Sequence, residues 1–337
     1  MKYPKFIEKG SNVCLVAPSF GASSEPYITK VNKAIRRFKQ LGYNVKFGPN
    51  TFKAELPYIS NEFIYVGHEF EDCYLDDNDA LISVGGGEFE CMTLEHTDFS
   101  KLQEPKWFMG FSDNTNHCFA LLTQCDTASI YGCCFGDFGM YNWDQSVKDA
   151  YDILTGHNLE FKGYPKYQIR HTKYQEKHPL AGYHLTEDKI LYCKDENVSF
   201  SGRMIGGCLD ILTLICGTKH DHVKEFLDKY QGDGFIWFLE ACDSNVLEYK
   251  RQLWKLKEAG WFKNCKGFLI GRPQRCFKEE IFEINRFNAL DVLEDLNVPI
   301  IADFDLGHIK PTMPIVLGSI GHVKKIGNEI ILKMELK

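Results

Sequence analysis

The sequence predicts an α/β protein with a doubly wound parallel sheet in its N-terminal half. Residues 12–17 form an apolar run of strand length, residues 26–41 place apolar side chains at helical spacing, and residues 44–48 return to a strand pattern. A strand, a helix and a strand in this order form a βαβ unit, which implies a parallel sheet with a right-handed crossover. Apolar strands at 80–84 and 107–109 continue the pattern.

The remaining elements predict a second α/β domain. In the N-terminal half we expect a helix near 61–74, a last strand at 128–131 and a helix near 145–155. In the C-terminal half we expect strands at 234–239, 267–271 and 298–302, helices at 208–216, 246–259 and 279–296, and a β-hairpin within 319–336. Because residues 157–200 are polar and aromatic without a sustained period, the predicted organisation is a nucleophile domain at 1–156, a linker with an insertion at 157–200, and a C-terminal domain at 201–337.

The composition narrows the classes of protein to which the chain can belong. Its 337 residues, 44% hydrophobic and 25% charged, are typical of a globular protein of two domains. The formal net charge of −7 argues against a nucleic acid polymer as partner, because phosphate contacts need a basic face. No apolar stretch approaches transmembrane length, and the N-terminal residues lack the apolar core of a signal peptide. We therefore expect a cytoplasmic protein with no membrane partner.

The thirteen cysteines show neither a disulfide pattern nor a metal pattern. Their number is odd, most lie inside apolar runs, and C-x-x-C is absent. We expect reduced thiols that serve as small core residues in a reducing compartment. The adjacent Cys133 and Cys134 lack the spacing of a zinc site, and His171, His178 and His184 share no helical or strand face, so no metal is expected.

Ser112 is the candidate nucleophile. It lies between the apolar strand at 107–109 and a helical pattern that resumes at Asn116. A serine on such a turn projects its hydroxyl out of the sheet, which is the geometry of a nucleophile elbow. Only the first half of the usual G-x-S-x-G signature is present, since Asn114 stands where the second glycine would be. The alternative is an ordinary helix N-cap.

Three glycines, Gly85 to Gly87, follow the strand at 80–84. Without a Cβ they can bring backbone N–H groups close to a ligand, although a flexible turn would show the same pattern. Their spacing does not match the G-x-G-x-x-G of a dinucleotide site, so no such cofactor is expected. Because parallel strands share their carboxyl-end edge, this loop and the Ser112 turn can meet. The amide of Gly86 or Gly87 and that of Asp113 would then form an oxyanion hole.

The C-terminal half supplies candidates for the acid and the base. Glu240 ends a strongly apolar strand, and a buried carboxylate needs a partner because an unpaired charge is costly to bury. It would cap the next helix, form a salt bridge or orient a histidine. His308 follows Gly307 in a loop flanked by prolines, where neighbouring residues can place the imidazole. His322 is its competitor, but it lies in the predicted hairpin and is expected to be structural or solvated.

Together these residues would make a serine hydrolase. Ser112 would be the nucleophile, His308 the general base and then acid, and Glu240 the group that fixes the imidazole tautomer. The alternative of a different class is a non-catalytic binding protein for small molecules, built on the same doubly wound domain with a hinge.

Seven segments resemble the LD-carboxypeptidase family of serine peptidases, which includes the microcin C self-immunity proteins. They run almost the whole length of the chain in the family's order: VAPS at 16–19, SVGGGE at 83–88, GFSDNT at 110–115, GGCLDILTLICGT at 206–218, FLE at 238–240, GFLIGR at 267–272 and DLGHIKPTMPIVLG at 305–318.

The resemblance implies a cytoplasmic serine hydrolase with a Ser-Glu-His triad that needs no metal or cofactor. Carried over residue by residue, Ser112, Glu240 and His308 match the triad, and Gly86 and Asp113 match the oxyanion amides. Many members of the family are dimers, so a homodimer is expected.

The resemblance leaves two substrates. One branch removes the terminal D-alanine of a murein tetrapeptide, and the self-immunity branch cleaves a peptidyl- or aminoacyl-nucleotide conjugate. The glycine loop lacks the Arg and Tyr of the murein branch, which favours the self-immunity type, whereas Phe111 and Asn114 depart from the family's usual elbow. Aromatic residues of the insertion, such as Tyr167 or Tyr174, would either stack on a nucleobase or pack the linker.

Overall fold

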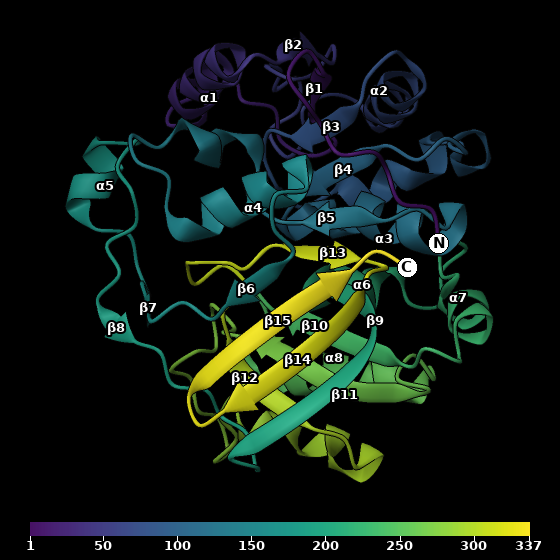
Figure 1. Ribbon diagram of the computed structural model, residues 1–337, viewed down its shortest axis with the longest axis vertical. Coiled ribbons are helices and arrows are strands. Elements are labelled where there is room, and N and C mark those ends of the chain that lie inside the picture. The colour runs from purple at the N-terminus through teal and green to yellow at the C-terminus, as the bar shows by residue number, and fades with distance from the viewer. The chain divides into compact units, whose positions relative to one another are not determined.

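The computed structural model describes residues 1–337, which form two compact units (Figure 1). The first unit comprises Met1–Asn158, His171–Tyr183 and Pro314–Val316. The second comprises Leu159–Arg170, His184–Met313 and Leu317–Lys337. Each unit is built around its own large sheet.

The first unit contains a six-stranded sheet in the order β13-β5-β4-β3-β1-β2. Strands β1 to β5 pair in parallel throughout. The order 2-1-3-4-5 is a doubly wound arrangement in which the connections reverse direction between β1 and β3. The fold class predicted for the N-terminal half is therefore confirmed. The strands are β1 (Asn12–Val16), β2 (Asn44–Phe47), β3 (Ala80–Ser83), β4 (Trp107–Gly110), β5 (Ser129–Tyr131) and β13 (Ile315–Leu317).

The helices of the first unit cover the faces of this sheet. Figure 1 shows α1 and α2 on either side of β1 and β3. Helix α1 buries one apolar stripe, including Val31 and Phe38, and ends at Gly42, whose φ of 100° supplies a left-handed cap. The helices are α1 (Tyr27–Leu41), α2 (Phe63–Leu75), α3 (Thr115–Cys125), α4 (Gln145–Thr155) and α5 (Lys173–Lys177), with 3-10 turns η1 (Glu90–Met92), η2 (Leu94–His96), η3 (Phe99–Lys101), η4 (Ser112–Asn114) and η5 (Phe135–Gly139).

The second unit contains a seven-stranded mixed sheet in the order β12-β11-β10-β9-β14-β15-β6. Strands β9 to β12 pair in parallel, and β14 and β15 form the predicted terminal hairpin beside β9 (Figure 1). Its strands are β6 (Glu160–Lys162), β9 (Asn197–Cys208), β10 (Phe235–Glu240), β11 (Cys265–Gly271), β12 (Ile300–Phe304), β14 (Ile320–Ile326) and β15 (Glu329–Glu335). Its helices are α6 (Leu209–Ile215), α7 (Val223–Lys229), α8 (Val246–Glu258) and the 3-10 helix η6 (Asn288–Leu296), and β7 (Lys166–Tyr167) pairs separately with β8 (Glu187–Asp188).

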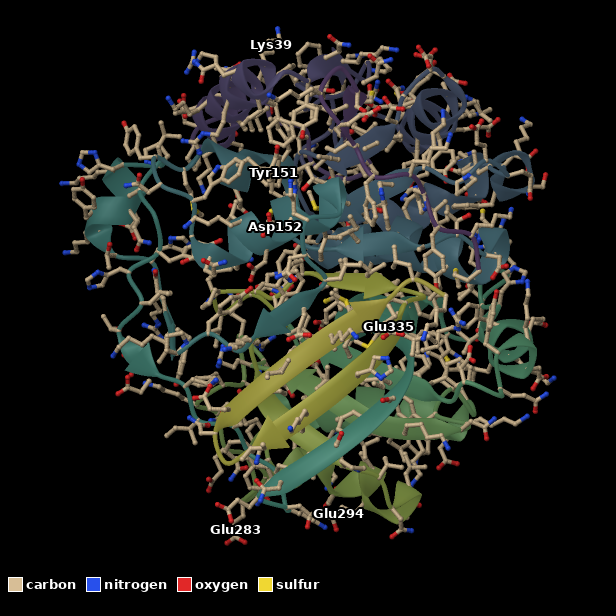
Figure 2. All side chains as sticks on the ribbon, in the orientation of Figure 1. Lys39, Tyr151, Asp152, Glu283, Glu294 and Glu335 are labelled. Atoms are coloured by element: carbon tan, nitrogen blue, oxygen red, sulfur yellow. The ribbon has the colours of Figure 1, made fainter.

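The helix predicted at 279–296 is wrong in its first half. Only η6 is helical, and before it the backbone turns back at Phe282 and Glu283, whose φ angles are 52° and 62°. Ile281 and Ile284 exchange two backbone hydrogen bonds across these residues, which makes a tight hairpin turn with positive φ at both central positions. Both central residues are exposed, and Figure 2 shows Glu283 pointing away from the unit.

Two short strands were missed because three residues carry no periodic signal. Strand β13 lies beyond β5, so the strand predicted at 128–131 is not the last in its sheet. Strand β6, within the aperiodic residues 157–200, forms one edge of the seven-stranded sheet. The same residues also contain β7, α5 and β8. No helix in the structure combines the length and the apolar character needed to cross a membrane.

Candidate active site

Ser112 stands on a strained turn between β4 and α3. Its φ is 63°, a left-handed conformation that is costly for a residue with a Cβ. Its backbone N–H donates to the Tyr131 hydroxyl at 3.1 Å, and its carbonyl accepts from the Thr115 hydroxyl at 2.7 Å. The capping alternative holds for Asn114, which is the N-cap residue of α3, and not for Ser112, because the N-cap residue of η4 is Phe111. The turn has the geometry of a nucleophile elbow.

The glycine loop meets the elbow, as the sequence predicted. A Cβ at Gly86 would lie 3.2 Å from Ser112 Cβ and 3.5 Å from Ser112 Oγ. The Asn114 side chain crosses between the two segments, because its Nδ2 donates to the Gly85 carbonyl at 2.9 Å and to the Phe111 carbonyl at 2.8 Å. The residue that replaces the second glycine of the usual signature therefore ties the glycine loop to the nucleophile turn.

The Asp113 side chain forms a second tie. Its Oδ2 accepts from Ser19 Oγ at 2.5 Å and from the Glu90 N–H at 3.0 Å, and Asn116 Nδ2 donates to its Oδ1 at 3.1 Å. The carboxylate is completely buried, and burial raises its pKa, while the hydrogen bond from Ser19 opposes the rise. Asp113 thus connects the loop after β1, the loop after β3 and the elbow. The sequence predicts a role only for the backbone N–H of this residue, as an oxyanion amide.

Behind these loops lies a buried pair. His117 Nδ1 and Glu90 Oε1 are 2.6 Å apart, and both side chains are fully buried. Burial, and then the charge of Asp113, raises the pKa of Glu90 well above its ordinary value. The pair connects η1 to α3 next to the elbow, and no pattern in the sequence distinguishes these two residues.

The second unit brings Glu240 and His308 together. His308 Nδ1 lies 3.0 Å from Glu240 Oε2; Glu240 is fully buried and the His308 side chain is 17% exposed. Glu240 is the last residue of β10, and His308 follows β12, so both stand at the carboxyl ends of parallel strands. Gly307, with a φ of 105°, permits the approach, since a Cβ there would lie 3.1 Å from Glu240 Oε2. Of the roles left open for Glu240, orienting a histidine is the one this geometry supports.

A buried ion pair stabilises the loop that carries His308. Arg272 Nη2 donates to Asp305 Oδ1 at 2.5 Å, and neither side chain is exposed. Asp305 Oδ2 accepts from the Tyr164 N–H at 2.7 Å, and the Arg272 N–H donates to the Leu306 carbonyl at 3.2 Å. The guanidinium also lies 4.3 Å from the centre of the Tyr167 ring, so Tyr167 packs within the second unit. These bracing residues also stand at strand ends, which is the signal that could have identified them.

His322 occupies the structural place predicted for it. Its Nδ1 lies 2.8 Å from Ser201 Oγ, across the pairing of β14 with β9, and its Nε2 lies 3.6 Å from Glu335. Figure 2 shows Glu335 on β15, where hydrogen bonds from Lys337 and Lys333 lower its pKa to about 2. All thirteen cysteines are free thiols, and no group of three or more His, Cys, Asp or Glu side chains is arranged to hold a metal ion.

A strained serine on the turn after a strand of a doubly wound sheet has the geometry expected of the nucleophile of a hydrolase. Two family models identify it further. The model described as the LD-carboxypeptidase N-terminal domain matches residues 13–132, and that described as the LD-carboxypeptidase C-terminal domain matches residues 201–323. The chain therefore belongs to the LD-carboxypeptidase family, and it is a serine hydrolase of the carboxypeptidase type, which displaces the alternative of a non-catalytic binding protein.

Relatives of two kinds are similar to this chain. The microcin C7 self-immunity protein MccF of Escherichia coli is 25% identical over 322 residues, which cover 89% of this chain and 87% of that protein. A solved MccF structure in complex with aspartyl sulfamoyl adenosine has a TM-score of 0.78, with 19% identity over 99% of this chain and 98% of that one. The MccF-like protein of Bacillus anthracis has a TM-score of 0.81 at 20% identity, with both chains fully covered. The muramoyltetrapeptide carboxypeptidase of Oxalobacter formigenes has a TM-score of 0.68 at 19% identity, over 97% of this chain and 99% of that one.

Proposed function

We propose that this peptidase cleaves peptidyl- or aminoacyl-nucleotide conjugates through an acyl-enzyme, with Ser112, His308 and Glu240 acting as one triad. The observation that carries the proposal is that each unit holds its part of such a triad in a geometry suited to catalysis. Ser112 is held at a φ of 63° beside the glycine loop, and His308 Nδ1 is 3.0 Å from Glu240. A buried carboxylate on Nδ1 leaves Nε2 as the nitrogen that accepts the serine proton.

The proposed reaction has two steps. Ser112 Oγ attacks the acyl carbonyl while His308 Nε2 takes the hydroxyl proton, and the amides of Gly86 and Asp113 stabilise the oxyanion. The tetrahedral intermediate breaks its bond to the leaving nitrogen, which receives the proton from His308. Water then attacks the acyl-enzyme with His308 again as base, and Ser112 leaves as the free hydroxyl. Glu240 keeps the imidazole tautomer fixed and stabilises the imidazolium that forms.

The choice of substrate rests on the relatives and on the glycine loop. MccF binds aminoacyl sulfamoyl nucleosides in its solved complexes, and it is similar to this chain over most of both lengths. The residues after Gly87 are Glu88, Phe89 and Glu90, without the Arg and Tyr of the murein branch. The murein tetrapeptide remains the second candidate because a muramoyltetrapeptide carboxypeptidase has the same fold.

The catalytic proposal is tested with a fluorophosphonate probe that reacts with polarised serines. The unmodified protein should be labelled, and Ser112→Ala and His308→Ala should lose the label. Ser201→Ala is the matched control, because Ser201 Oγ also lies within hydrogen-bond distance of a histidine but sits on an ordinary strand. Labelling that persists in Ser112→Ala, or disappears in Ser201→Ala, would contradict the assignment.

The substrate proposal needs a separate assay. Aspartyl sulfamoyl adenosine and a murein tetrapeptide are incubated with the same enzyme, and the released amino acids are quantified. We expect release of aspartate and no release of D-alanine. D-Alanine release from the tetrapeptide with the nucleoside conjugate untouched would assign the chain to the murein branch instead.

A further inference from the structure

Three exposed aromatic side chains gather in the first unit at the ends of β1 and β3. Phe20 follows β1, Tyr58 lies in the loop before α2, and Phe89 follows the glycine loop. Each is 38% exposed, although most of the large apolar side chains of this unit are buried. We name these three residues the aromatic cluster.

Phe20 lies directly against the glycine loop. Its N–H donates to the Gly86 carbonyl at 3.1 Å, and a Cβ at Gly87 would lie 2.9 Å from Phe20 Cδ2. Gly86 in turn contacts Ser112, with only 3.2 Å between a Cβ at this glycine and Ser112 Cβ. Gly86 therefore lies between Phe20 and the nucleophile turn. The absence of a side chain at Gly87 leaves the space that the Phe20 ring occupies.

Tyr58 and Phe89 are held in the same region. Their ring centres are 5.2 Å apart at an interplanar angle of 62°, an edge-to-face contact. The Ser60 N–H donates to the Ser19 carbonyl at 2.8 Å, which draws the loop of Tyr58 to the residue before Phe20. Phe89 precedes Glu90, whose N–H is bound by Asp113. The same hydrogen bonds that fix the elbow thus fix the aromatic cluster.

The aromatic cluster lies at the edge of the sheet on which ligands bind in this fold. In an open doubly wound sheet, ligands lie beyond the carboxyl ends of the strands, where the winding reverses. In this chain the reversal is between β1 and β3, and Phe20 and Phe89 follow these two strands. Most other exposed rings of this unit lie elsewhere, whereas the aromatic cluster lies at the edge of the sheet on which ligands bind.

We propose that the aromatic cluster is a substrate subsite that binds a planar aromatic group beside the bond cut at Ser112. The inference rests on the proposed function and narrows its substrate class. Aromatic side chains stack on any flat ring and gain by burying their exposed area, whereas a peptide of small and charged residues offers them little. The planar group is either the nucleobase of a conjugate or an aromatic side chain of its acyl part.

The test measures binding to the Ser112→Ala protein, so that it does not depend on turnover. Calorimetric titrations use aspartyl sulfamoyl adenosine, phenylalanyl sulfamoyl ribose without a base, and aspartyl sulfamoyl ribose. Phe20→Ala, Phe20→Leu and Phe89→Leu are introduced into this background, with Tyr141→Ala as the control because Tyr141 is an exposed ring, 63% accessible, far along the chain from the cluster. Thermal melting confirms that each variant is folded.

We expect each cluster substitution to raise the dissociation constant of one of the two ring-bearing ligands by about tenfold, because stacking of one base on one ring contributes a free energy of that order. Aspartyl sulfamoyl ribose, which has no ring, should bind equally to all variants, and Tyr141→Ala should change nothing. A loss confined to the adenosine ligand identifies the nucleobase as the planar group, and a loss confined to the phenylalanyl ligand identifies the acyl side chain.

Equal affinity of both ring-bearing ligands for the folded cluster variants and for the Tyr141→Ala control would overturn the subsite. The fluorophosphonate probe separates this result from failure of the proposed function. With Ser112 intact, the unmodified protein and Tyr141→Ala should both be labelled, so labelling of these two proteins together with unchanged ligand binding by the cluster variants rejects the aromatic subsite alone. An unmodified protein that is not labelled rejects the catalytic proposal itself.

Discussion

Asp113 is a buried side chain whose three hydrogen bonds hold the glycine loop against the elbow. In Asp113→Asn the amide nitrogen would face donors that now share a carboxylate, so the loop should shift and misplace the oxyanion amides. We expect the rate of fluorophosphonate labelling of Ser112 to fall about tenfold or more. Asp98→Asn is the control, because Asp98 caps η3 in the same unit without contacting the elbow. Equal labelling rates in both variants would remove this role from Asp113.

Ser112 itself stores backbone strain. A left-handed conformation costs a residue with a Cβ roughly 1 kcal/mol, and glycine escapes this cost. Ser112→Gly should therefore be more stable to urea unfolding than Ser112→Ala by up to about 1 kcal/mol, although both lack the nucleophile. At Ser146, the second residue of α4, the same pair of substitutions should show the opposite order, because glycine is a poorer helix former than alanine. If the glycine and alanine variants had the same order of stability at both positions, the claim that Ser112 is strained would be refuted.

Glu69 makes stability depend on pH. It is buried on α2, and burial raises its pKa to about 7, against the opposing hydrogen bond from the Asn50 N–H. Since the folded-state pKa is raised, this residue costs no stability below pH 4.5, costs progressively more as pH rises, and reaches its full cost above pH 7. At about 1.4 kcal/mol per pKa unit, the full cost is roughly 3 kcal/mol.

Glu69→Gln should accordingly gain stability over the unmodified protein as pH rises from 4.5 to 7.5. Urea unfolding of both proteins at several pH values measures this difference, in which the titration of all other groups cancels. The difference should grow through this window and become constant above it. A difference independent of pH would show that Glu69 does not titrate in the folded protein as its burial implies.

The loop that carries His308 depends on one glycine. A Cβ at Gly307 would lie 3.1 Å from both Cβ and Oε2 of Glu240, and its φ is 105°. Gly307→Ala should therefore push the imidazole away from its carboxylate and lower the labelling of Ser112 and the hydrolytic rate by about tenfold or more. Gly217→Ala is the matched control, because Gly217 has a φ of 84° and no atom within 4 Å of a Cβ. That variant should lose some stability and keep its activity.

Long periodic elements could be predicted from the sequence, whereas short ones could not. Helix α1 and the strands β1 and β10 carry apolar patterns that extend over several residues, and they fall where they were expected. The turn at Phe282 and Glu283 interrupts an apolar spacing that suits a helix, because two left-handed residues override the pattern. Strands β6 and β13 take their structure from the neighbours they pair with, which no local pattern reveals.

The candidate site divides in the same way. Ser112, Gly86, Glu240 and His308 could be proposed because each is a chemically distinctive residue at the end of a predicted strand. Other residues act through hydrogen bonds to partners far away in the sequence, and only the folded structure reveals these partners. They are Asp113, Asn114, Ser19 and the Arg272–Asp305 pair. The homodimer and the cytoplasmic location stay predictions from the sequence and its resemblance.

For the molecule as a whole, the small strand β13 has a consequence during synthesis. Residues 314–316 belong to the first unit, and they pair beside β5, which was made almost two hundred residues earlier. While the ribosome is still adding the second unit, the nascent chain therefore displays an open β edge that another polypeptide can pair with. Because β5 is only three residues long, this edge is a poor template for pairing, and its shortness protects the unfinished chain until β13 has been synthesised.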